Sequence, residues 1–80
     1  MTLLQFKLLD KTEQLETAWN SPLLATIEDN DFTYDLHQID SFFIEVKYRK
    51  SNRTVIGIKT FKNRDLLQPY LKQIDINKML

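Results

Sequence analysis

The chain of 80 residues contains no cysteine, and this absence excludes several kinds of site. Without a thiol there is no disulfide, no thiolate zinc site, no iron–sulfur cluster and no cysteine nucleophile. The only glycine is Gly57, whereas phosphate-binding loops and dinucleotide fingerprints need several glycines so that backbone N–H groups can approach a phosphate. We therefore expect neither a cofactor nor a metal ion.

Long apolar runs are also missing. The longest are three residues, such as Phe42-Phe43-Ile44, whereas a membrane-spanning helix needs about 20. Residues 1–7 show neither a basic segment ahead of an apolar core nor a small-residue cleavage site, so we expect no signal peptide, no membrane contact and a cytoplasmic protein. Hydrophobic residues make up 42 % of the chain and charged residues 28 %, which is typical of one small globular domain over residues 1–80.

Helical signals stand near both ends of the chain. Asp10 and Glu13 have the spacing of a capping box, and Ser21-Pro22 ends the run, which predicts a helix over residues 10–20. Residues 2–9 fit either a short strand or an extension of this helix, because their apolar residues satisfy both periods. A second helix is predicted over residues 65–74, where apolar residues recur at helical spacing. These residues are Leu66, Leu67, Tyr70, Leu71 and Ile74.

The middle of the chain alternates with a period of two, which predicts strands over residues 23–28, 31–38, 42–49 and 53–61. We expect a two-residue turn at 29–30 and three-residue turns at 39–41 and 50–52. These registers place the large apolar side chains of every strand on one face. The predicted fold is α+β: an N-terminal helix, a four-stranded antiparallel meander and a C-terminal helix, with the helices on one face of the sheet and the other face open.

One acidic segment nearly has the spacing of a calcium-binding loop. Its oxygen-bearing side chains belong to Asp29, Asp31, Thr33, Asp35 and Asp40. However, Tyr34 stands where the sharp turn of such a loop requires glycine, and no predicted helix flanks the segment. We interpret it as a polar hairpin.

Acid–base chemistry has few candidates. The predicted register places Asp35 directly opposite Glu45, and two close carboxylates can raise one pKa. Nothing in the sequence indicates a cleft that excludes water, so we interpret the two as surface charges. His37 is the only histidine, and no motif places a serine beside it. We therefore expect no catalytic residue and no enzyme activity.

Charge is distributed unevenly although eleven basic and eleven acidic residues balance. Residues 1–40 carry two basic and eight acidic side chains, a balance of −6, and residues 41–80 carry nine and three, a balance of +6. Residues 28–40 hold five acids and no base, whereas residues 47–64 hold seven bases and no acid. The seven are Lys47, Arg49, Lys50, Arg53, Lys59, Lys62 and Arg64. The two segments predict complementary patches.

This polarity leaves two functions open. The first is a non-catalytic protein-interaction or assembly module that self-associates, because opposite patches on one chain can pair across a homodimer. Its candidate surface on the open face is His37, Phe43, Lys47, Val55 and Lys59. The alternative is weak nucleic-acid binding through the basic hairpin 47–64, whose seven basic side chains would contact phosphates.

Overall fold

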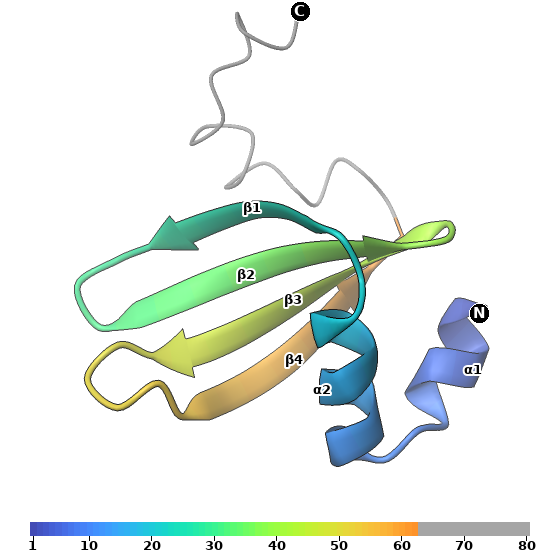
Figure 1. Ribbon diagram of the computed structural model, residues 1–80, viewed down its shortest axis with the longest axis horizontal. Helices are drawn as coiled ribbons and strands as arrows, with labels where there is room; N and C mark the ends of the chain where they lie inside the picture. Colours follow the sequence, from blue (N-terminus) through green and yellow to red (C-terminus); the bar gives the residue numbers. More distant parts are fainter. Residues whose placement is uncertain (63–80) are drawn as a thin grey trace, which may run out of the picture.

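The chain forms one antiparallel sheet with two helices on one of its faces (Figure 1). The computed structural model describes residues 1–62. The elements are α1 (Leu3–Lys7), α2 (Lys11–Trp19), β1 (Leu23–Glu28), β2 (Phe32–Ile39), β3 (Phe42–Arg49) and β4 (Val55–Phe61). The strands follow one another in the order β1-β2-β3-β4. This confirms the predicted N-terminal helix and antiparallel meander, while the helix predicted over residues 65–74 lies outside the described residues.

Two capping boxes explain why residues 2–20 form two short helices. At α2, Glu13 N–H donates to Asp10 Oδ1 at 2.8 Å, and Asp10 N–H donates to Glu13 Oε1 at 3.4 Å. Thr2 and Gln5 make the same reciprocal pair at the start of α1. Each box satisfies N–H groups that have no partner inside the helix, so each defines a start. Within residues 1–62, neither helix is long and apolar enough to cross a membrane.

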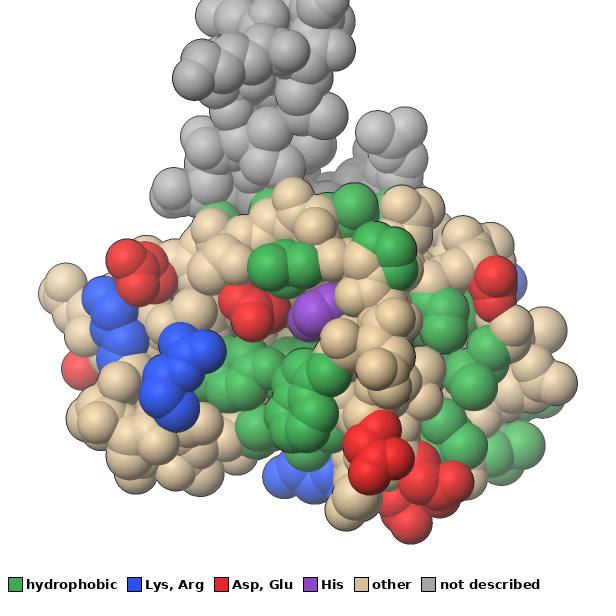
Figure 2. Space-filling view, in the orientation of Figure 1, with side chains coloured by type: hydrophobic (Ala, Val, Ile, Leu, Met, Phe, Trp, Pro, Cys, Tyr) green, Lys and Arg blue, Asp and Glu red, His purple; other side chains and the backbone are tan. Residues whose placement is uncertain are grey.

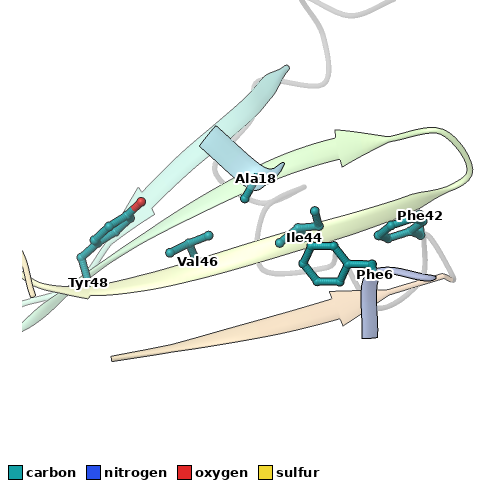
Figure 3. Close-up of a cluster of buried hydrophobic side chains, with 6 residues drawn as sticks. All are labelled: Phe6, Ala18, Phe42, Ile44, Val46 and Tyr48. Carbon is teal, nitrogen blue, oxygen red and sulfur yellow. The ribbon is translucent and has the colours of Figure 1, made fainter. Parts of the chain in front are cut away.

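The face of the sheet beneath α1 and α2, here called the helix face, carries the first core (Figure 3). This cluster consists of Phe6, Ala18, Phe42, Ile44, Val46 and Tyr48. The rings of Phe6 and Phe42 meet with centroids 5.7 Å apart and planes tilted by 56°. Burying a side chain of this size stabilises a fold by about 1.5–3 kcal/mol. The central strand β3 therefore anchors both helices.

The turn between β2 and β3 is one residue shorter than predicted, and this difference changes which side chains of the two strands share a face. The turn contains only Asp40 and Ser41, so Ile39 pairs with Phe42. Asp40 adopts a φ of 50°, in the left-handed region that tight hairpin turns need and aspartate tolerates. The predicted three-residue turn was wrong, and a slip of one residue moves every side chain of β2 to the other face relative to β3.

Apolar side chains consequently lie on both faces of the sheet. Opposite the helices, on what we call the second face, Leu36 and Phe43 are only 2 % and 7 % exposed. Partly buried apolar residues from three strands pack around them, and these are Ala25, Ile27, Tyr34 and Phe61. We refer to these six residues as the second-face cluster. The expectation of a single apolar face is therefore wrong.

The other two hairpins also differ from the predicted register, but most of their side chains stay on the predicted face. The β1–β2 turn is centred on Asn30 and Asp31, so Ile27 pairs with Tyr34 instead of Phe32. The pairing of β3 with β4 also slips by two residues along most of its length, and a bulge follows Lys47. Because side chains alternate with a period of two, a slip of two residues keeps most of them on their predicted sides. The exceptions lie at the two bulges, where Leu23 pairs with His37 and Val55 pairs with Tyr48.

The conformation of Asp40 gives a first test of this fold. Asp40→Val is expected to lower the free energy of unfolding by about 1–3 kcal/mol, because a β-branched residue is strained at positive φ. Asp40→Asn is the control, since asparagine tolerates this conformation but lacks the carboxylate, which pairs with the amino group of Met1. Urea unfolding followed by tryptophan fluorescence measures both. Equal midpoints for the two variants would contradict the role given to the turn.

Candidate functional site

The polar side chains of Thr33, Asp35 and His37 in β2 lie on the helix face, contrary to expectation. Thr33 and His37 are each 5 % exposed there, and the hydroxyl of Thr26 donates to Asp35 Oδ1 at 2.9 Å. Asp35 pairs across the sheet with Val46, so Glu45 points to the opposite face. The predicted juxtaposition of these two carboxylates does not occur, because the β2–β3 register differs by one residue.

His37 lies deep in the helix face. Its Nδ1 is 3.2 Å from the carbonyl oxygen of Ser21, and its buried Nε2 has no hydrogen-bond partner among the described residues. The hydroxyl of Ser21 donates instead to the carbonyl oxygen of Thr17 at 2.7 Å. The ring therefore meets the backbone of Ser21 and not its nucleophilic oxygen, and this contact does not form a serine–histidine pair.

The predicted interaction surface is divided between the two faces. Phe43, Lys47 and Lys59 lie on the second face. His37 lies on the helix face, and Val55 packs against the first core. Placing these five residues together was wrong, because the shorter β2–β3 turn moves His37 to the helix face and the bulge after Lys47 moves Val55 there.

Part of the basic segment forms a cluster with aromatic rings on the second face. Lys47 Nζ lies 4.0 Å from the ring centroid of Phe32 and 5.6 Å from that of Tyr34. The guanidinium carbon of Arg49 lies 5.9 Å from the Phe32 centroid. A cation near the face of an aromatic ring is attracted by the electrons of that ring. Two of the predicted phosphate contacts are thus engaged with this chain's own side chains.

The acidic and basic hairpin tips lie side by side at one end of the sheet (Figure 1). Lys50 Nζ is 3.3 Å from Glu28 Oε2 and donates to the carbonyl oxygen of Asp29 at 3.2 Å. The Lys50 N–H donates to the carbonyl oxygen of Asp31 at 2.8 Å. An exposed ion pair contributes only about 0–1 kcal/mol. The contact nevertheless brings together, within one chain, charges that we expected to pair between two copies.

The remaining basic residues are spread over the molecule. The guanidinium carbon of Arg53 lies 5.1 Å from the centroid of Tyr48, a residue of the first core. Lys59 lies opposite Glu45, and Lys62 follows the end of β4. Arg64 lies outside the described residues. The predicted nucleic-acid contacts therefore do not form one continuous surface within residues 1–62.

Asp29 organises the acidic hairpin tip. The backbone N–H groups of Asp31 and Phe32 donate to its Oδ1 at 2.9 and 2.8 Å, and these hydrogen bonds lower the pKa of the Asp29 carboxyl. The hydroxyl of Tyr34 donates to Asp29 Oδ2 at 3.1 Å. Partial desolvation and then this bond raise the pKa of Tyr34. Among residues 1–62, no group of acidic or histidine side chains is arranged to hold a metal ion.

The surface that our sequence analysis missed lies on α1. Leu4 and the C-cap residue Leu8 are 68 % and 78 % exposed, four positions apart, and Met1, three residues before Leu4, is 44 % exposed. We call these three residues the α1 stripe. Figure 2 shows hydrophobic side chains gathered over α1. On its other side the same helix presents Phe6 to the first core. The sequence contains a sign of this exposed surface, because residues 1–9 have enough apolar side chains to occupy two sides of a helix, of which only one can face the core.

A second exposed apolar group lies where α2 leads into β1. Trp19 is 54 % exposed, yet its indole Nε1 donates to the buried hydroxyl of Tyr48 at 2.7 Å. Leu23 and Leu24, at the start of β1, are 54 % and 46 % exposed. The structure thus anchors one edge of the Trp19 ring against the sheet while leaving much of the ring accessible.

No protein-family model matches the chain, and comparisons with curated proteins and with solved structures found no match.

The hydrogen bond between Trp19 and Tyr48 can be tested directly, because Trp19 is the only tryptophan. Tyr48→Phe removes the acceptor and is expected to cost about 1 kcal/mol of stability. It should also shift the fluorescence emission to longer wavelength as the indole loosens. Tyr34→Phe, which removes the hydroxyl bonded to Asp29, is the matched control and should leave the emission unchanged. An unchanged spectrum for Tyr48→Phe would contradict the anchored indole.

The lowered pKa of Asp29 predicts a pH dependence of stability. Its folded value lies below the reference value of 3.8, so the ionised carboxylate stabilises the fold above that pH, and this contribution is lost as the pH falls through the folded value. The stability difference between the wild type and Asp29→Asn should therefore shrink between about pH 6 and about pH 3. Asp31→Asn, in the same turn, is the control. A difference that stays constant in urea unfolding would contradict the assignment.

Proposed function

We propose that this protein is a non-catalytic protein-interaction module that self-associates through the α1 stripe. The observation that carries the proposal is the exposure of Leu4 and Leu8 on a helix whose other side is already in the core. A helix that is apolar on both sides is normally covered on both sides. Polar residues of α1 are limited to Gln5 and Lys7. A partner that covers Leu4 and Leu8 would complete the burial of this helix.

A second copy of the chain fits the stripe because two-fold symmetry places the same patch on both partners. An antiparallel pair of α1 helices would set Leu4 of one copy against Leu8 of the other. Each such side chain contributes about 1.5–3 kcal/mol when fully buried. Association costs about 4–15 kcal/mol in lost freedom of motion. We therefore expect a weak dimer whose population depends on concentration.

Catalysis and nucleic-acid binding have less support. Asp35 and Glu45 lie on opposite faces of the sheet, and the Nδ1 atom of His37 lies beside the backbone carbonyl of Ser21. Among the basic residues, Lys50 is tied to the acidic tip, and Lys47 lies over aromatic rings of its own chain. A polyanion would have to displace these contacts. Nucleic-acid binding is thus the second candidate, and the measurement below distinguishes it from self-association.

Self-association predicts a mass that rises with concentration in light scattering on a sizing column. The double variant Leu4→Glu, Leu8→Glu should stay monomeric at every concentration, because burying four carboxylates at a two-fold interface is unfavourable. The double variant Leu23→Glu, Leu24→Glu is the matched control, with two exposed leucines changed away from α1. It should dimerise like the wild type.

The same column, run at low and high salt with absorbance at two wavelengths, detects bound nucleic acid. A monomer that carries nucleic acid only at low salt would favour the second candidate. A wild-type monomer at the highest concentration, free of nucleic acid, would reject self-association. Loss of the dimer in the Leu23, Leu24 variant alone would reject the α1 stripe as the interface. Matching circular dichroism spectra would show that each variant is folded.

A further inference from the structure

We propose that the outer edge of β1 binds an extended segment of a partner protein, which adds a further strand to the sheet. β1 is an outer strand of the meander, and within residues 1–62 its only neighbouring strand is β2 (Figure 1). An outer strand presents unpaired N–H and C=O groups, and these form a template for another strand. The proposal stands independently of the α1 dimer, because it concerns no residue of α1.

The hydrogen bonds of the first hairpin identify the available backbone groups. The Asp29 N–H donates to the carbonyl oxygen of Phe32 at 3.0 Å, which sets the phase of the ladder. In an antiparallel pair, the residues that exchange hydrogen bonds alternate along each strand. Ile27 therefore also bonds to β2, whereas the N–H and C=O groups of Thr26 and Glu28 point away from it. Both residues are exposed, and within residues 1–62 neither makes a backbone hydrogen bond on that side.

The edge of β1 lacks the features that keep sheet edges from pairing. A lysine in the middle of an outer strand discourages the approach of another strand, and β4, the other outer strand, carries Lys59 in this way. Residues 24–27 of β1 contain neither a charge nor a proline. A bulge interrupts the pairing of β1 only near its start, between Leu23 and Ala25. We therefore assign the docking edge to β1 and not to β4.

The beginning of β1 offers apolar contacts to such a strand. Leu23 and Leu24 are 54 % and 46 % exposed, and Trp19, at the end of α2, is 54 % exposed. Further along β1, Ala25 and Ile27 are partly buried at the margin of the second-face cluster. Apolar side chains on neighbouring strands stabilise each other where they meet on one face. The partner segment thus carries apolar side chains at alternate positions and at its end beside Leu23.

The other end of β1 is acidic and indicates the charge of the partner. Residues 20–31 contain three acids, Glu28, Asp29 and Asp31, and no base. Lys50 of the neighbouring hairpin tip approaches only Glu28 with its ammonium group, so the tip keeps an excess of negative charge. A basic side chain on the partner is attracted to this end. The edge is therefore complementary in charge to a segment that is basic at one end and apolar at the other.

The direction of the partner follows from the ladder. Antiparallel pairing is slightly more stable per residue than parallel pairing and continues the alternation of the meander. It places the amino-terminal end of the partner segment at the acidic tip and its carboxyl-terminal end beside Leu23. The six residues of β1 span about 20 Å. The partner is thus a short extended segment that begins with basic residues and continues with alternating apolar residues.

Amide hydrogen exchange followed by NMR tests the proposal with a synthetic peptide of this pattern, Lys-Arg-Thr-Val-Thr-Val-Thr-Leu with blocked ends. In the free protein, the N–H groups of Thr26 and Glu28 should exchange fast and that of Ile27 slowly. At millimolar peptide, exchange at Thr26 and Glu28 should slow by about tenfold or more, and exchange at Ile27 should not change. This alternation is the signature of an added strand, because contacts between side chains alone do not protect every second amide.

Three results of this measurement would overturn the proposal. Slow exchange of both amides in the free protein at every concentration would show that the edge is already covered within one molecule. Slow exchange that appears only at high protein concentration would show that a second copy occupies the edge. Unchanged exchange at millimolar peptide would show that no strand is added.

A pair of variants at Thr26 separates the backbone contact from the side chain. Thr26→Pro removes the outward N–H but none of the hydrogen bonds to β2, because proline is tolerated on an outer strand where its nitrogen faces solvent. It should abolish the change that the peptide causes in the fluorescence of Trp19, the only tryptophan. Thr26→Ala is the matched control, since it also loses the hydroxyl bonded to Asp35 but keeps the N–H, and it should bind like the wild type. Equal binding by the two variants would contradict strand addition.

A second pair of variants leaves the backbone unchanged, in case the proline disturbs the fold. Leu23→Glu with Leu24→Glu should weaken peptide binding by about tenfold or more, because the apolar end of the edge is lost. Leu4→Glu with Leu8→Glu, in the α1 stripe, should bind the peptide like the wild type. Equal affinity of the two double variants would overturn the proposal, and loss of binding in the α1 variant alone would place the peptide on α1. Failure of this proposal is thus distinguishable from failure of the α1 dimer.

Discussion

The two-residue turn between β2 and β3 is the constraint on which the rest of the molecule depends. It pairs Ile39 with Phe42 and thereby decides which side chains of the two central strands share a face. Leu36 then lies beside Phe43 on the second face, while Phe42 and its neighbours on β3 receive the helices. A turn longer by one residue would have placed the apolar side chains of β2 under the helices and its polar ones in the open. The positive φ of Asp40 makes the short turn accessible to the chain.

The same register separates the polar residues that the sequence analysis considered for acid–base chemistry. Asp35 and Glu45 are separated by the sheet itself, and His37 lies against the α2–β1 connection, where the carbonyl oxygen of Ser21 meets its ring. Part of the charge asymmetry of the sequence is likewise paired within one molecule. The acidic and basic hairpin tips are neighbours in space, because both turns lie at one end of a meander, and Lys50 bridges them. Their contribution to stability is small, but the contact forms within one chain a charge pair of the kind expected between chains.

Apolar surface, more than charge, therefore distinguishes this molecule. The α1 stripe leaves two leucines exposed on a helix that already contributes Phe6 to the core, and Trp19 is held at one edge by Tyr48. Of the interaction residues predicted from the sequence, Phe43 and Val55 are used inside the molecule. The predicted surface and the exposed surface differ because exposure depends on which elements cover each other. The leucines of α1 have an apolar character that the sequence displays, but their position relative to the core is a property of the packed structure.

The sequence by itself determined the local features. The capping pairs Thr2–Gln5 and Asp10–Glu13 act over three residues, and the alternation of apolar and polar residues marks the strands without reference to distant parts of the chain. Only the tertiary structure decided the length of the turn at Asp40, because both turn lengths are locally acceptable, and the choice between them depends on how the two faces pack. It also decided that α1 has an exposed side and that Lys50 meets Glu28, since these contacts join segments far apart in the sequence. The physical reason is the same in each case. Alternation along one strand determines which of its side chains share a face, whereas packing between distant segments determines which face is buried.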